Sequence, residues 1–366
     1  MNVSRSAAYA LGVMAAALLF AACGGGPQSS SLAPNATTNA ARSGASLLRN
    51  DALEAFVTTR QPGPAHPDRH QSWISPDAKR IPRLLFVSDS GKDDVYIYSL
   101  PHMTLEGTLT GFNDPQGLCS DTKGHVYVVN TGTNQVFSYS HSGTPGQIYT
   151  DPFGPPVGCA VDPISDQLAV ADISGFSGAG QVVYLFFTSI APVAVSNPAQ
   201  YSYYFLGFGK GGELWTSGRA SDGSYMVSQC NFKTCSTVNL SGGTIYFPGA
   251  VQWDNARHRW VLFDQLCGDT EAACSYPVSA SSVLGKPTHY DNYEGGNDCD
   301  MVQGAIAGHD MNFVVGGDYE YCGAASSSYG RWQYTAGGNP KNYAVLSSAY
   351  SVPIGTAVST KNVPSE

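Results

Sequence analysis

Charged side chains are scarce in this 366-residue sequence. Asp, Glu, Lys and Arg make up 13% of it, the formal net charge is −9, and no run of Lys and Arg exceeds two residues. A surface that follows the phosphates of a nucleic acid needs a stripe of basic side chains. We therefore expect no nucleic-acid partner.

Long apolar runs are missing after residue 22, so we expect no membrane span in the rest of the chain. Two enzyme patterns are missing as well. No Gly-x-Ser-x-Gly nucleophile elbow occurs, and the stretch 175–180 lacks the spacing of a phosphate-binding loop.

The first 22 residues have the pattern of a secretory signal. They contain one positive charge, at Arg5, and an Ala-rich apolar core that ends just before Cys23. The small residues before Cys23 resemble the lipobox of bacterial lipoproteins. This resemblance implies a diacylglyceryl group on the Cys23 thiol, an anchor in the membrane, and an extracytoplasmic place in the bacterial cell envelope. The alternative is an ordinary cleaved signal that leaves Cys23 free.

Residues 23–82 are expected to form a flexible tether. The part from 24 to 46 is rich in Gly, Ser, Asn, Thr and Ala without periodicity, and 47–57 has room for one short amphipathic helix. His66 and His70 follow, but no Cys or carboxylate pattern accompanies them. We expect them to be solvated rather than bound to a metal.

One strand-and-turn phrase occurs six times after the tether. In its clearest pair, 85–91 with 95–98 is matched 41 positions later by 126–132 with 136–139. Short β-rich runs with Gly, Asn and Asp turns at such a period are typical of propeller blades.

A second phrase, Pro-x-Gly followed by an alternating run, gives the first strand of each blade. Copies occur at 115–121, 156–162, 248–254 and 353–359, with weaker ones at 204–207 and 303–306. Only the copy at 353–359 has no second strand after it, and only the second strand at 84–89 has no first strand. The sequence therefore predicts an all-β, six-bladed propeller over residues 83–366, in which the C-terminal strand closes the first blade.

Small and acidic residues in these phrases have structural roles in this interpretation. Gly117, Gly158 and Gly355 are expected where inner strands crowd the axis and leave no room for a Cβ. The Asp or Asn that ends most second strands is expected to start the following turn through its own side chain.

The sequence has nine cysteines, so one of them would stay unpaired in an oxidising compartment. If Cys23 carries lipid, eight cysteines remain to form disulfides. Many pairings are open, so local spacing must choose among them. Hairpin and loop lengths favour Cys230 with Cys235 and Cys267 with Cys274, which leaves Cys299 with Cys322 and Cys119 with Cys159. The last pair also fits the repeat, because the two cysteines lie one residue apart on equivalent strands and therefore point to opposite, mutually facing sides of neighbouring blades.

The two phrases resemble those of the NHL-repeat and gluconolactonase-like six-bladed propellers. This superfamily includes lactonases, lyases and proteins that only bind, so the resemblance implies a fold and no single activity. It also implies a site at one mouth of the central channel. In a calcium-dependent hydrolase of this kind, a carboxylate enters the channel just before the inner-strand glycine.

The corresponding positions in this sequence carry no charge: Gln116, Val157, Tyr204, Gly249, Gln303 and Ile354. We therefore expect no catalytic residue and no metal ligand here. The candidates for binding a neutral ligand at the channel mouth are Asn113, Asp114, Gln116, Tyr204 and Gln303.

Other chemistry-bearing groups are sparse. The acidic stretch 291–300 clusters oxygen ligands, and calcium is the alternative to an exposed connection, but the ligand spacing of a calcium loop is missing. No cofactor is otherwise expected. His125, His258 and His309 fall at or near turns before second strands, where solvated side chains are typical.

We expect a non-catalytic, lipid-anchored scaffold that presents its loops and channel mouth to a protein, a glycan or a small molecule. The alternative is a lactonase-like or lyase-like hydrolase with a degenerate site around Asn113 and Asp114. An enzyme of that kind would need several carboxylate or His side chains that converge at one channel mouth.

Overall fold

The computed structural model of the protein describes residues 72–175, 178–185, 190–267, 272–291, 301–307, 312–318, 327–346 and 351–361. All of them belong to the unit of the chain that spans residues 50–366. Cys23, the signal segment, His66, His70, His309, Cys299, Cys322 and all but the first residue of the 291–300 stretch lie outside these ranges. None of the helices within them is long and apolar enough to cross a bilayer.

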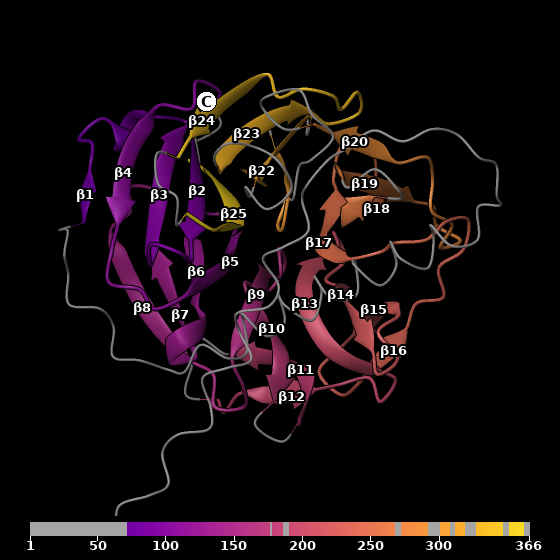
Figure 1. Ribbon diagram of the computed structural model, residues 1–366. Helices are drawn as coiled ribbons and strands as arrows, with labels where there is room; N and C mark the ends of the chain where they lie inside the picture. Colours follow the sequence, from indigo (N-terminus) through magenta and orange to yellow (C-terminus); the bar gives the residue numbers. More distant parts are fainter. Residues whose placement is uncertain are drawn as a thin grey trace, which may run out of the picture. The chain divides into compact units, whose positions relative to one another are not determined.

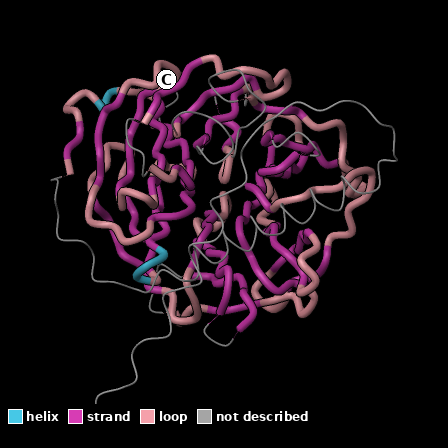
Figure 2. Tube along the Cα trace, viewed as in Figure 1, coloured by secondary structure: helices cyan, strands magenta, loops and turns pink. Residues whose placement is uncertain are grey.

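The described chain is built almost entirely of strands, which form six antiparallel sheets arranged as the blades of a propeller (Figures 1 and 2). The fold predicted from the repeats is therefore confirmed. From the axis outward, the first three blades are β25 (Pro353–Thr360), β2 (Arg83–Asp89), β3 (Asp94–Ser99), β4 (Leu105–Leu109) and β1 (Trp73–Ile74); then β5 (Pro115–Ser120), β6 (Val126–Asn130), β7 (Gln135–Tyr139) and β8 (Pro145–Thr150); then β9 (Pro156–Val161), β10 (Leu168–Gly175), β11 (Gly178–Leu185) and β12 (Val193–Val195).

Blades 4 to 6 have four strands each. They are β13 (Gln200–Phe208), β14 (Leu214–Ala220), β15 (Tyr225–Cys230) and β16 (Cys235–Thr237); then β17 (Pro248–Asp254), β18 (Arg259–Cys267), β19 (Ala272–Val278) and β20 (Thr288–Tyr290); then β21 (Ala305–Ala307), β22 (Phe313–Asp318), β23 (Ser328–Gln333) and β24 (Asn342–Val345). Two single-turn 3-10 helices, η1 (Ala78–Arg80) and η2 (Thr131–Thr133), complete the described elements.

The C-terminal strand closes the ring as predicted. β25 pairs with β2 from Arg83 opposite Thr360 to Asp89 opposite Pro353. In Figure 1 the yellow β25 lies beside the purple β2, although the two are far apart in the sequence. This pairing covers the inner edge of β2, which would otherwise expose a row of unpaired peptide groups.

Strand β1 gives the first blade a fifth strand. Trp73 pairs with Thr108 and Ile74 with Gly107 on the outer edge of β4. Strand β1 and helix η1 lie in the last part of the segment that the composition assigns to the tether. A strand of two residues leaves no periodic signal in a sequence.

The core lies between the blades, because each sheet buries both faces against its neighbours. Successive residues of β2 from Leu84 to Val87 are therefore all fully buried, although their side chains alternate between the two faces. Aromatic rings join the blades: Trp215 of blade 4 stacks on Trp260 of blade 5 with ring centroids 4.6 Å apart. These two tryptophans therefore pack between neighbouring blades.

The inner strands approach one another so closely at the axis that a side chain would not fit. A Cβ added to Gly117 would lie 2.6 Å from the carbonyl oxygen of Val157. The same addition at Gly158 would overlap the carbonyl oxygen of Tyr204, and at Gly355 that of Gln116. These contacts confirm the structural role predicted for the three glycines.

The described residues contain three disulfides, between Cys119 and Cys159, Cys230 and Cys235, and Cys267 and Cys274. The first joins the inner strands β5 and β9 of neighbouring blades, as the strand register predicts. The predicted Cys299–Cys322 pair lies outside the described residues.

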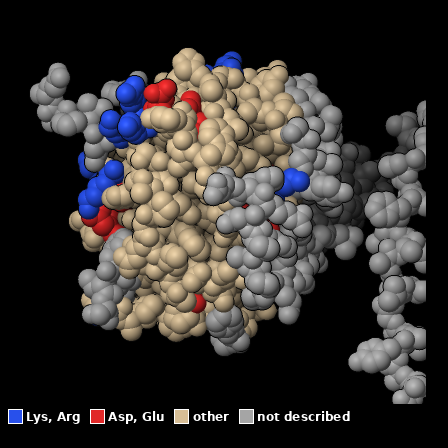
Figure 3. Space-filling view, turned by 90° about the vertical axis from the view of Figure 1, so that its left-hand side faces the viewer, with Lys and Arg blue, Asp and Glu red and all other residues tan. Residues whose placement is uncertain are grey.

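Charged side chains are sparse on the side of the propeller formed by the first two blades. Figure 3 shows that basic and acidic groups lie side by side in one part of this face, at its upper left. Ion pairs among the described residues include Lys123 with Asp166 at 2.5 Å and Arg80 with Asp77 at 3.4 Å. Among the residues in colour, no basic stripe crosses this face.

Candidate binding site at the central channel

The central channel has two different ends. Inner strands begin at the proline end, where Pro115, Pro156, Pro248 and Pro353 lie. They finish at the hairpin end, where each inner strand turns into the second strand of its blade. The predicted site belongs to the proline end.

A cluster of buried apolar side chains, which we call the plug, lies at the proline end of the channel in the described structure. Its buried side chains are Val157, Ile173, Tyr204, Phe205, Phe247, Val302 and Ile354. Three of them, Val157, Tyr204 and Ile354, occupy positions where a hydrolase of this superfamily was expected to place polar ligands. Tyr204 is 5% exposed, so its ring packs in the plug rather than lining an open mouth.

The structure brings Asn113, Asp114 and Gln116 together, but their side chains are buried and bonded to the protein. Gln116 donates from Nε2 to Oδ1 of Asp114 at 2.8 Å. The peptide nitrogens of Asn113 and Asp114 donate to the side chains of Asn130 and Asp93, at 2.7 Å each. With exposures of 8%, 0% and 3%, the three residues offer little surface to a ligand.

Gln303 is shifted by one residue from the position assigned to it by sequence. Ala305 pairs with Val315, three residues before Asp318, just as Cys119 pairs with Tyr127, three residues before Asn130. Counted from these pairs, Gln303 corresponds to Gly117 and not to Gln116. The register of the β21–β22 pairing, from Ala305 to Ala307, sets this position, and the weak phrase at 303–306 is one residue out of step with that register. A shift of one residue reverses the side to which a side chain points.

The acids at the ends of second strands accept hydrogen bonds from peptide nitrogens of the loops that lead into the inner strands. Oδ1 of Asp89 accepts from the peptide nitrogens of Gly91 and Val352. Asp264 likewise accepts from Tyr246, Phe247 and Leu266. The bonds from Gly91 and Leu266, two residues on, confirm the predicted turn role. Burial raises the pKa of both carboxyls, that of Asp264 to about 6.

Blade 3 departs from this pattern, because its acid, Asp172, faces a second carboxyl instead of peptide nitrogens. Asp151 takes the bond from the incoming loop, at 2.8 Å from the peptide nitrogen of Phe153. Gln181 donates to Asp172 at 3.0 Å. Burial raises the pKa of Asp151 to about 6, and burial together with the charge of Asp151 raises the pKa of Asp172 well above its ordinary value. The two acids therefore share a proton.

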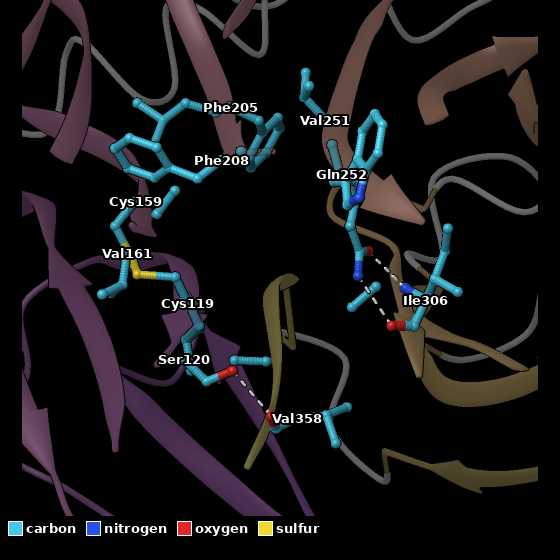
Figure 4. A pocket seen from close by; sticks show the side chains of 18 of the residues that line it. Cys119, Ser120, Cys159, Val161, Phe205, Phe208, Val251, Gln252, Ile306 and Val358 are labelled. Atoms are coloured by element: carbon cyan, nitrogen blue, oxygen red, sulfur yellow. Dashed lines mark hydrogen bonds between the residues drawn. A yellow bond between two sulfur atoms is a disulfide. The ribbon is translucent and has the colours of Figure 1, made fainter. Parts of the chain in front are cut away.

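A cavity of about 280 Å³ opens at the hairpin end and is lined by all six inner strands (Figure 4). Its lining includes small residues such as Ala160, Gly207 and Ala305, and its aromatic members are Phe205, Phe208 and Trp253. Of the five predicted mouth residues, Gln303 alone is among its lining residues. The sequence interpretation placed the site at the opposite end of the channel.

Neutral polar side chains in the lining bond to the backbone of the neighbouring inner strand. Gln252 of β17 donates to the carbonyl of Ile306 at 3.0 Å and accepts from its peptide nitrogen at 2.7 Å. Ser120 donates to the carbonyl of Val358 at 2.9 Å. Figure 4 shows both contacts as dashed lines.

Among the described residues that line the cavity, Asp121 and Lys210 carry the charge. The Asp121 carboxylate accepts from the peptide nitrogens of Lys123 and His125 and lies 2.7 Å from Nδ1 of His125. His125 is thus a half-exposed turn residue, as expected. Across the described ranges, no three His, Cys, Asp or Glu side chains gather in a way that could hold a metal ion.

Part of the chain is similar in sequence to known repeat proteins. The family model described as NHL repeat matches residues 112–139. The mouse NHL-repeat-containing protein 4 is 36% identical over 104 residues, which are 27% of this chain and 73% of that protein. The chain belongs to the NHL-repeat family.

Solved structures resemble this NHL propeller in fold. A chain in a nidogen/laminin complex has a TM-score of 0.57 at 14% identity and covers 77% of this chain and 100% of its own length. TolB from Acinetobacter baumannii gives 0.55 at 11% identity, with coverage of 78% and 68%. A protein of unknown function from Bacteroides caccae gives 0.52 at 11%, with coverage of 76% and 99%. At these identities the likeness concerns the fold alone.

Proposed function

We propose that this NHL propeller is a binding module that takes a small neutral ligand, or one projecting group of a protein or glycan partner, into the cavity at the hairpin end. The observation that carries the proposal is the cavity itself: about 280 Å³, lined by every inner strand. Concave sites with apolar walls and a few placed polar groups are typical of small-molecule binding. We further propose that no catalysis takes place there.

The neutral character of the ligand follows from the lining. The carboxylate of Asp121 is already engaged by its own turn and by His125. Lys210 is exposed at the rim. A charged ligand inside the cavity would lose its hydration without gaining a buried partner of opposite charge.

A ligand screen on the full chain tests this proposal. Neutral fragments that bind the cavity should raise the melting temperature and change the fluorescence of Trp253. The variant Val358→Trp, which places an indole in the cavity lining, should abolish both responses. Val345→Trp on the exposed outer strand β24 is the matched control. Responses that survive in Val358→Trp, or turnover in a metal-supplemented lactone hydrolysis assay, would contradict the proposal.

We also propose that the propeller is held by lipid at Cys23 on the extracytoplasmic side of a bacterial envelope membrane. Disulfides form in oxidising compartments, and this chain carries three that are described. In a bacterial host, the wild-type chain should incorporate labelled palmitate and sediment with membranes, whereas Cys23→Ser should do neither. Equal labelling of the two proteins would exclude Cys23 as the anchor.

A further inference from the structure

The inner edges of the six inner strands face the cavity, and alternate residues of each strand point their peptide N–H and C=O toward it. This follows from antiparallel pairing, in which every second residue bonds to the neighbouring strand and the others point away. Contacts at Leu118 of β5, Thr356 of β25 and Ile306 of β21 identify the inward residues directly, since their peptide groups bond to side chains in the channel.

Two glutamines bind these edges in the same way. The Gln303 amide accepts from the peptide nitrogen of Leu118 at 3.0 Å and donates to the carbonyl of the same residue at 2.7 Å. Gln252 repeats this two-point contact on Ile306. A primary carboxamide fits because its C=O and one N–H lie on the same side of the amide. An ordinary trans peptide amide presents these groups on opposite sides.

Blades 3, 4 and 5 have equivalent inward residues whose peptide groups have no such glutamine amide bonded to them, a contact that we call a cap. Leu118 pairs with Val128, two residues before the end of the second strand at Asn130. By the same count, the equivalent residues are Cys159, Leu206 and Val251, followed two positions later by Val161, Phe208 and Trp253. All six line the cavity. Within the described ranges, no side chain bonds to their peptide groups.

We infer that the cavity recognises a neutral ligand whose amide N–H and C=O lie on the same side, such as a primary carboxamide or a lactam. The ligand bonds to the open edges of β9, β13 and β17 as Gln303 and Gln252 bond to β5 and β21. This inference rests on the function proposed above, because it assigns a chemical class to the ligand of the same cavity.

Matched probes test the inference on the full chain labelled with ¹⁵N. Benzamide has an amide N–H and C=O on the same side. N,N-dimethylbenzamide has no N–H, and methyl benzoate replaces the amide by an ester of similar size. Benzamide should bind at least tenfold more tightly than the other two and should shift the peptide N–H signals of Val161, Phe208 or their equivalents. Shifts confined to residues outside the cavity would overturn the inference.

The binding of the three probes also distinguishes a failure of the amide class from a failure of the proposed binding site. If all three probes bind the cavity equally, the amide class is wrong and the binding site stands. If none binds, and the Val358→Trp variant changes no response in the fragment screen, both fail.

Removing one internal amide gives a second, independent readout. Gln252→Ala leaves the inward peptide group of Ile306 without its cap, so benzamide should shift the Ile306 signal in this variant and not in the wild type. Gln229→Ala, on an exposed position of β15, is the matched control. No Ile306 response in a folded Gln252→Ala variant would contradict the inference.

Discussion

Gln303 bonds through both ends of its side-chain amide to the peptide group of Leu118, 185 positions away in the sequence. The same oxygen also accepts from the peptide nitrogen of Thr356 at 3.1 Å. One side chain of blade 6 thus holds the inner edges of blades 1 and 2. In a propeller, where no further strand can pair with an inner edge, such side chains replace the missing neighbour.

Gln303→Leu should therefore destabilise the propeller strongly. The substitution leaves buried peptide groups of Leu118 and Thr356 without partners, and each unsatisfied group costs about 1–3 kcal/mol. We expect the free energy of unfolding to fall by roughly 3 kcal/mol in chemical denaturation. Gln147→Leu, on the exposed face of β8, should change it by less than about 0.5 kcal/mol. Similar losses of unfolding free energy in the two variants would contradict a structural role of the Gln303 amide.

The shared proton of Asp151 and Asp172 should make stability depend on pH. Both carboxyls have a pKa in the folded state above the unfolded value, so protonation favours folding. Their contribution is greatest below pH 4 and is lost as the pH rises through about 6 and beyond. Thermal denaturation between pH 4 and pH 8 measures this loss together with that of the buried Asp89 and Asp264 carboxyls, whose pKa burial also raises.

Asp151→Asn should reduce that pH dependence. The new amide still accepts from the peptide nitrogen of Phe153 and donates to the Asp172 carboxylate, so no shared proton is needed. We expect a gain on the order of 1–2 kcal/mol at pH 8 relative to the wild type. Asp77→Asn, at an exposed ion pair, is the control and should leave the profile unchanged. A wild-type slope that persists in Asp151→Asn would assign the pH dependence to other groups.

Gly158→Ala should test the close approach of inner strands. Its methyl group would overlap the carbonyl oxygen of Tyr204, a backbone atom that cannot move without shifting β13. Overpacking of this kind costs about 1–3 kcal/mol. Gly243→Ala is the matched control, because its methyl group would meet side-chain atoms of Leu284 at an ordinary 3.4 Å. A smaller loss of melting temperature at Gly158 than at Gly243 would disprove the steric argument.

The disulfide between Cys119 and Cys159 should contribute more to stability than the one between Cys230 and Cys235. The first closes 40 positions of sequence and the second only 5, and a longer loop loses more entropy in the unfolded chain when it is cross-linked. Replacing both cysteines of the longer pair by Ser should cost about 2–4 kcal/mol. Urea denaturation of the two double variants compares them directly, and a larger loss for Cys230 and Cys235 would reverse this order.

Features that repeat within the sequence could be predicted from it. The copy of the Pro-x-Gly phrase at 353–359 has no second strand, and this imbalance alone predicts the closure of the first blade by β25. The opposite orientation of Cys119 and Cys159 follows from counting alternate residues along equivalent strands. Both arguments need only the period of the repeat and the two-residue period of a strand.

Features that break the repeat could not be predicted. Nothing in residues 303–306 shows that the strand register makes Gln303 equivalent to Gly117 rather than to Gln116, yet the Gln303 side chain bonds to the peptide group of Leu118. Likewise, Asp172 has the same position in its phrase as Asp89 and Asp264. Only the loop that carries Asp151 replaces its peptide donors by a carboxyl.

The sequence by itself determined the number of blades, the closing strand and the glycines at the axis, because each depends on local spacing that every copy of the phrase repeats. The tertiary structure alone decided which end of the channel is filled and which is open. That outcome depends on side chains from six strands, far apart in the chain, that meet only when the ring closes. Val157, Tyr204 and Ile354 fill the proline end together, whereas small residues and backbone edges leave space at the hairpin end.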